Sequence, residues 1–64
     1  MKNKVKELRK ARGLRQEDVA KLLGVTRQTI NAIENNKYDP TLSLAFRLAR
    51  ELGVTVDGLF TPGE

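Results

Sequence analysis

The chain has 64 residues, of which 39% are hydrophobic and 31% are charged. A chain of this length forms one domain with a small core, and its net charge of +4 favours an anionic partner. It contains no Cys and no His, which excludes disulfides and ordinary zinc sites and removes the commonest general base near neutral pH.

The first predicted helix begins after Asn3, which can act as its N-cap, and runs to about Arg12. Gly13 ends it, because glycine adopts the left-handed conformation of a C-terminal cap without steric cost. Apolar residues at helical spacing form its inner face: Val5, Leu8 and Ala11. We therefore expect this helix to place a single apolar stripe against the core.

The second predicted helix, Gln16–Leu23, is followed by Gly24 as its left-handed cap. Its apolar residues recur at helical spacing: Val19, Ala20, Leu22 and Leu23. Arg15, the preceding residue, has no side-chain acceptor for the free amides of the first turn, which should cost about 1 kcal/mol. Glu17 and Asp18 should partly offset this cost through the helix dipole.

The third predicted helix, Arg27–Glu34, follows Val25 in the turn and has Thr26 as its N-cap. Ile30 and Ile33 form its inner face. Its outer face carries polar residues that are neighbours on a helix surface: Arg27, Gln28 and Asn31. This outer face has no acidic residue, as suits a surface that meets the edges of bases.

A loop and two further helices are predicted after residue 34. The loop spans residues 35–40, and Thr41 then caps a helix, Leu42–Leu52. The apolar stripe of that helix is too wide for one neighbour, so we expect it at the centre of the core. Its members are Leu42, Leu44, Ala45, Phe46, Leu48, Ala49 and Leu52. A short helix, Val56–Phe60, follows, and residues 61–64 are expected to fray.

Residues 16–35 resemble the helix-turn-helix of phage-repressor-like regulators (Cro/C1-type, XRE family), most clearly at Gln16, Ala20, Gly24, Ile30 and Ile33. The flanks ELRKARGLRQ, IENNKYDPTLSLAFRLARELGV and TVDGLF also resemble the family, so the likeness covers nearly the whole chain. It implies an all-α, compact five-helix bundle, with residues 1–64 forming a single lambda-repressor-like DNA-binding domain. It further implies a sequence-specific transcriptional regulator of double-stranded DNA, expected to be a repressor that reads the major groove with helix 27–34.

The resemblance assigns two sets of contacts to DNA. Base edges are expected to meet the outer residues of helix 27–34, since arginine pairs well with guanine and glutamine with adenine: Arg27, Gln28 and Asn31. The phosphate backbone is expected to meet Arg15, Gln16, Thr26, Asn35, Lys37 and Tyr38. Tyr38 could equally cover the edge of the core. Arg9 could also reach a phosphate, but an internal ion pair with Glu34 is the favoured interpretation.

The chain departs from the family pattern at two positions. Arg15 stands where the family usually has a Ser or Thr N-cap, and Asn36 stands where it usually has Gly. Asparagine is the residue that best replaces glycine in a left-handed cap, so we expect the backbone at Asn36 to keep that conformation.

The resemblance also implies a homodimer on a pseudo-palindromic operator, with half-sites about one helical turn apart. The expected interface is C-terminal and comprises Val56, Leu59 and Phe60. Of these, Leu59 is expected in the core, whereas Phe60 is expected to be partly exposed and shared with the partner protomer. The sequence indicates no cofactor, no metal site and no small-molecule effector site.

The main alternative is an antitoxin-type protein-binding module with autoregulatory DNA binding, which co-purification of a small partner would reveal. An enzyme is disfavoured, because the chain has no glycine-rich phosphate loop and because Glu17 and Asp18 diverge on a helix. No apolar run approaches the roughly 20 residues that span a bilayer. The basic N-terminus also lacks the apolar segment of a signal peptide, so a cytoplasmic location without membrane contact is expected.

Overall fold

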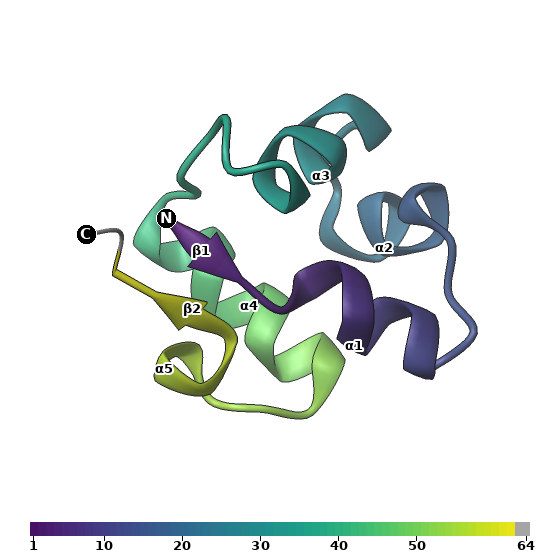
Figure 1. Ribbon diagram of the computed structural model, residues 1–64. Helices are drawn as coiled ribbons and strands as arrows, with labels where there is room; N and C mark the ends of the chain where they lie inside the picture. The colour runs from purple at the N-terminus through teal and green to yellow at the C-terminus, as the bar shows by residue number, and fades with distance from the viewer. Residues whose placement is uncertain (63–64) are drawn as a thin grey trace.

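A computed structural model describes residues 1–62, which form five helices and one two-stranded sheet (Figure 1). The helices are α1 (Val5–Ala11), α2 (Gln16–Leu23), α3 (Arg27–Glu34), α4 (Leu42–Leu52) and α5 (Val56–Leu59). The strands are β1 (Lys2–Asn3) and β2 (Phe60–Thr61). Helices α2, α3 and α4 have the bounds predicted from the sequence, whereas α1 and α5 each end one residue earlier.

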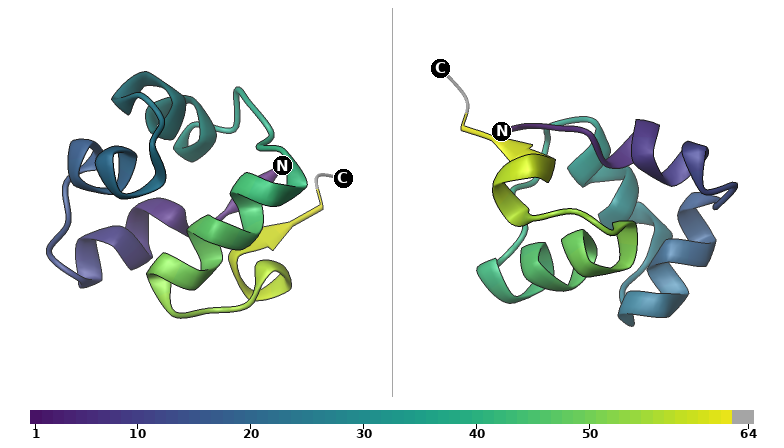
Figure 2. Two further views of the ribbon diagram at one scale, coloured as in Figure 1. Left: turned by 180° about the vertical axis from the view of Figure 1, so that it is seen from behind. Right: turned by 90° about the horizontal axis from the view of Figure 1, so that it is seen from below.

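Helix α4 lies between the α2–α3 pair and α5, as the view from behind shows (Figure 2). Side chains from all five helices and from β2 meet around it to form the core: Val5, Val19, Ala20, Leu23, Ile30, Ile33, Leu44, Ala45, Leu48, Ala49, Leu52, Leu59 and Phe60. This central position of α4 is the one that its wide apolar stripe predicted.

Three leucine or phenylalanine side chains that were expected to face the core are instead exposed. On α4, Leu42 is 70% exposed and Phe46 is 55% exposed, because neighbouring elements cover only the face that carries Leu44, Ala45 and Leu48. On α2, Leu22 is 53% exposed. The apolar stripe read from the sequence is therefore wider than the buried face of either helix, and α4 presents apolar side chains to solvent.

The starts of α3 and α4 follow the capping residues read from the sequence, whereas α1 begins one residue later than expected, with Lys4 rather than Asn3 at its N-cap position. Thr26 Oγ1 accepts a hydrogen bond from Thr29 N at 3.2 Å, and Thr41 Oγ1 accepts one from Leu44 N at 3.2 Å. Asn36 has a φ of 60°, which is the left-handed conformation predicted for it after α3.

Two arginine side chains cap the carboxyl ends of helices distant in sequence. Arg12 Nε donates to the carbonyl of Leu52 at 3.2 Å, and Arg47 Nη2 donates to the carbonyl of Leu23 at 2.9 Å. The last carbonyls of a helix lack partners within it, so a cationic donor there satisfies them and interacts favourably with the helix dipole. These contacts join α1 to α4 and α4 to α2.

The five helices confirm the expected all-α bundle, to which one two-stranded sheet is added. Strand β1 pairs antiparallel with β2, placing Lys2 opposite Thr61 and Asn3 opposite Phe60. Thr61 is therefore paired rather than frayed as expected, whereas Gly63 and Glu64 lie outside the described residues. Phe60 is 6% exposed, so the expectation of a partly exposed side chain is wrong. That expectation fails because the extended backbone at Phe60 turns its ring onto the core.

No helix within residues 1–62 is long and apolar enough to cross a membrane.

Candidate nucleic-acid interface

Helices α2 and α3 form a rigid unit around the turn at Gly24. Gly24 has a φ of 69°, and the amide of the next residue, Val25, donates to the carbonyl of Ala20 at 3.0 Å. Ala20 is 3% exposed, while Ile30 and Ile33 on α3 are at most 1% exposed. Because the inner face of α3 is buried in this way, its outer face is held in a fixed direction.

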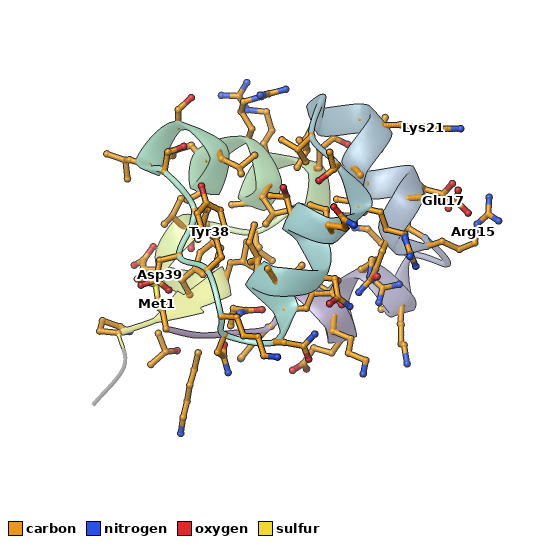
Figure 3. The ribbon with its side chains drawn as sticks, turned by 90° about the horizontal axis from the view of Figure 1, so that it is seen from above. Met1, Arg15, Glu17, Lys21, Tyr38 and Asp39 are labelled. Atoms are coloured by element: carbon orange, nitrogen blue, oxygen red, sulfur yellow. The ribbon has the colours of Figure 1, made fainter. Side chains whose placement is uncertain are left out.

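The outer face of α3 carries the three residues expected to meet bases, and Figure 3 shows the molecule from above. Arg27, Gln28 and Asn31 are all exposed. Asn35 Nδ2 donates to the carbonyl of Asn31 at 2.9 Å and lies 3.2 Å from Asn31 Oδ1. Asn31 therefore has its side-chain oxygen engaged, whereas its amide nitrogen points to no acceptor among the hydrogen bonds of residues 1–62.

Glu34, at the end of α3, is the centre of a buried polar network. Its Oε2 accepts from Arg9 Nε at 2.7 Å, and its Oε1 accepts from Arg9 Nη2 at 3.1 Å and from Gln16 Nε2 at 3.0 Å. The third nitrogen of the guanidinium, Nη1, donates to the carbonyl of Leu14 at 2.8 Å. With side chains only 8% and 2% exposed, Arg9 and Glu34 form an internal ion pair. Because all three guanidinium nitrogens donate to internal acceptors and the side chain is buried, Arg9 is held away from a phosphate.

The start of α2 is capped in a way that the sequence interpretation missed. Asp18 Oδ2 accepts from the backbone amide of Arg15 at 2.8 Å, which is one half of a capping box. The sequence carries the signal for this cap, since Asp18 stands at the N3 position, in addition to the helix-dipole effect expected of it. This backbone hydrogen bond, together with the Arg15 side chain, lowers the pKa of the exposed Asp18 carboxyl below its ordinary value of 3.8.

Arg15 projects into solvent beside acidic neighbours (Figure 3). Its guanidinium lies 3.1 Å from Glu17 Oε1 and 3.3 Å from Asp18 Oδ2. The hydrogen bond to Asp18 and the two nearby carboxylates raise the pKa of Arg15. The positive charge of Arg15 is thus locally balanced, which weakens it as a partner for phosphate relative to an unpaired cation.

The loop after α3 is tied to the first strand by Asn3. Asn3 Nδ2 donates to the carbonyl of Ile33 at 2.8 Å and to Asn36 Oδ1 at 3.1 Å, while Asn3 Oδ1 accepts from Val5 N at 3.1 Å. The sequence identified Asn3 only as a helix cap and missed its contact with α3, because the contact spans 30 positions. The loop that carries Lys37 is therefore anchored at its base.

Lys37 and Tyr38, the two side chains of this loop that were expected at the phosphates, are both exposed. The backbone amide of Lys37 donates to the carbonyl of Ala32 at 2.9 Å. Tyr38 is 44% exposed and lies on the same side of the molecule as Met1 and Asp39, far from Arg15 (Figure 3). Lys37 and Tyr38 both follow the carboxyl end of α3, whereas Thr26 precedes its amino end, so the expected phosphate contacts do not form one patch.

Within residues 1–62, no group of three or more acidic, Cys or His side chains could hold a metal ion. The arrangement offers fixed hydrogen-bond donors, an exposed polar helix face and flanking cations. These are features of a surface that recognises a polyanion.

Comparison with known proteins agrees with this geometry. The helix-turn-helix family HTH_3 matches residues 5–59. The chain is 57% identical over 60 residues to the uncharacterized HTH-type transcriptional regulator MJ0272 of Methanocaldococcus jannaschii, covering 94% of this chain and 91% of that protein. It is 45% identical over 60 residues to the uncharacterized HTH-type transcriptional regulator YgzD of Bacillus subtilis, with the same coverage of 94% and 91%.

The fold is also found among solved structures. The hypothetical transcription factor NHTF from Neisseria superposes with a TM-score of 0.79 at 29% identity, over 91% of this chain and 67% of that one. The segment matched by the family model, residues 5–59, contains both helices of the helix-turn-helix and the helices that support them. The chain therefore belongs to the Cro/C1-type (XRE) family of helix-turn-helix transcriptional regulators.

Proposed function

We propose that the protein is a sequence-specific repressor that binds double-stranded DNA and reads the major groove with α3. The observation that carries this proposal is the outer face of α3, which is exposed, polar and free of acidic residues while its inner face is buried. Arg27 and Gln28 lie in the first turn, the part of a recognition helix that reaches base edges first. Arginine can bind guanine O6 and N7, and glutamine can bind adenine N6 and N7. Asn31 would follow one turn later.

The residues around α3 would hold the phosphate backbone. Gln16 at the start of α2 and Thr26 at the start of α3 lie near helix amino ends, where free amides favour anions. Asn35, Lys37 and Tyr38 would bind beyond the other end of α3. Arg15 would contribute less than Lys37, because Arg15 already has two carboxylates within 3.3 Å.

We further propose that the repressor is a homodimer whose protomers meet along the outer surface of α4 and α5. A groove of about 660 Å³ lies there between Phe46, Val54 and Val56. Leu42, 70% exposed, lines a second groove that shares the half-buried Val56 with the first. Of the residues first expected at the interface, Val56 has the most accessible surface, since Leu59 and Phe60 are only 1% and 6% exposed.

The charges at this groove are suited to a second copy of the chain. Arg50 and Asp57 both line the groove and are exposed. In a two-fold interface each patch meets its own copy, so Arg50 of one protomer can meet Asp57 of its partner. Such a dimer would present two α3 helices to a pseudo-palindrome with half-sites about one helical turn apart.

A selection of bound sequences from randomised duplexes tests the reading function. The full chain should enrich duplexes with two related half-sites, and a reporter placed downstream of them should be repressed by the protein in cells. Enrichment of no sequence, or of none with repeated half-sites, would contradict the proposal.

Sedimentation of variants tests the dimer. Phe46→Glu should convert the protein to monomers, because it places a carboxylate in the apolar groove. Leu22→Glu is the matched control, since Leu22 is 53% exposed on α2, away from the groove, and should leave the dimer intact. The same apolar groove is the observation that favours the antitoxin-type alternative. A wild-type chain that sediments as a monomer and co-purifies with a small protein would support that alternative.

A further inference from the structure

The Gln16 side chain forms a hydrogen bond with a buried carboxylate, that of Glu34. Its Nε2 donates to Glu34 Oε1 at 3.0 Å, and the same oxygen accepts from Arg9 Nη2 at 3.1 Å. The Glu34 side chain is 2% exposed, whereas Gln16 is half-buried at the surface between α2 and α3. Gln16 therefore connects a fixed internal carboxylate with the surface proposed to meet DNA.

This contact fixes which end of the Gln16 side-chain amide faces the carboxylate and which end faces outward. A carboxylate can only accept hydrogen bonds, so it binds the nitrogen of a carboxamide and turns the oxygen away from itself. The amide nitrogen carries two hydrogens, of which Glu34 takes one. The second N–H and the carbonyl oxygen remain for a ligand, in an orientation that a free glutamine would adopt only part of the time.

The ion pair with Arg9 makes this arrangement compatible with a polyanion. The guanidinium lies 2.7 Å from Glu34 Oε2 and balances the carboxylate charge. Glu34 can therefore hold Gln16 near phosphates without presenting an uncompensated negative charge.

We propose that Glu34 is a positioning residue for DNA binding: fixed by Arg9, its carboxylate holds the Gln16 amide in the orientation that donates to a phosphate. The inference rests on the proposed DNA-binding function. Its physical basis is pre-organisation, because a side chain that is already ordered loses less conformational freedom on binding. It also couples the start of α2 to the end of α3 across 18 positions of the chain.

A double-mutant cycle measured on DNA affinity tests this role. The variants are Glu34→Gln, Gln16→Ala and the two combined, each titrated against the best duplex from the selection. Glu34→Gln should weaken binding by roughly 3- to 10-fold when Gln16 is present, as expected for coupled neighbours, and by less than about 2-fold in the Gln16→Ala background. Equal weakening in both backgrounds would overturn the proposal.

A matched charge control separates positioning from net charge. Glu51→Gln removes a negative charge from an exposed position on α4, so it changes the net charge by the same amount as Glu34→Gln. It should leave affinity unchanged or slightly raised. If it weakened binding as much as Glu34→Gln does, the effect of Glu34 could not be assigned to Gln16.

A measurement on the wild-type chain keeps the proposal testable if Glu34→Gln does not fold. The side-chain amide of Gln16 should show an NMR order parameter well above that of exposed glutamine Gln28 in the free protein. A Gln16 value below about 0.6 would show a mobile side chain and overturn the proposal. A wild-type chain that binds no duplex would instead refute the proposed function, while the order parameter would still report whether Glu34 holds Gln16.

Discussion

Removing either member of the buried Arg9–Glu34 pair should strongly destabilise the domain. Glu34→Ala would leave the Arg9 guanidinium, 8% exposed, with only the Leu14 carbonyl as a partner. Arg9→Ala would leave a carboxylate, 2% exposed, with only Gln16 Nε2. Breaking a buried pair in this way typically costs about 3–5 kcal/mol, because the remaining charge stays desolvated and uncompensated.

That cost is large relative to the stability of so small a protein. At about 0.05–0.15 kcal/mol per residue, a domain of 64 residues has a free energy of unfolding of roughly 3–10 kcal/mol. Each single variant should therefore lose a third or more of its stability. At the lower end of that range it would be largely unfolded at room temperature.

Urea denaturation followed by circular dichroism measures the effect in a double-mutant cycle. The double variant Arg9→Ala/Glu34→Ala should be no less stable than the less stable single variant, since it contains no unpaired buried charge. This corresponds to a coupling energy of about 3 kcal/mol, at the upper end of measured values. Additive losses would refute the reasoning, because they would show that the two side chains stabilise the fold independently.

Three further predictions follow from individual contacts. Arg27→Ala should cost about 1–3 kcal/mol on the best operator and relax base preference, whereas Lys37→Ala should weaken binding to all sequences and lower the salt slope by about one per protomer. Salt titrations on operator and scrambled duplex distinguish them, and equal weakening of both duplexes by Arg27→Ala would make Arg27 a phosphate contact. Asn36→Gly should be more stable than Asn36→Ala by roughly 1–2 kcal/mol in urea, because both lack the amide and only glycine is unstrained at a φ of 60°. The lowered pKa of Asp18 means that its stabilising contribution is fully present above 3.8 and is lost as pH falls through the lower folded value. In thermal melts Asp18→Asn should therefore be less stable than wild type near neutral pH and approach it in acid, and a difference that is constant with pH would contradict this assignment.

Local sequence patterns were sufficient to place the helices that carry the candidate interface. Thr26 and Thr41 marked helix starts, and the left-handed positions Gly24 and Asn36 marked helix ends, because each acts on backbone groups within three or four positions of itself. The apolar spacing of Ile30 and Ile33 also identified the buried side of α3, which left its polar side for recognition.

Contacts between distant segments depended on the tertiary structure. The pairing of β1 with β2 joins the two ends of the chain, and neither two-residue strand has an alternation long enough to predict it. That pairing buried Phe60, which the sequence had left for a partner protomer. Likewise, an apolar stripe on α4 could not show that Leu42 and Phe46 lack neighbours.

Within the candidate interface, the polar network around Glu34 also depended on the tertiary structure. The pairing of Arg9 with Glu34 was expected only through family resemblance, and the sequence alone left Arg9 available for phosphate. The hydrogen bond from Gln16 to Glu34 was not expected at all, because both residues appear as surface positions at opposite ends of the helix-turn-helix. Propensity and capping act between near neighbours and can be read from the sequence, whereas the burial of a charge and the choice of its partner depend on how the helices pack.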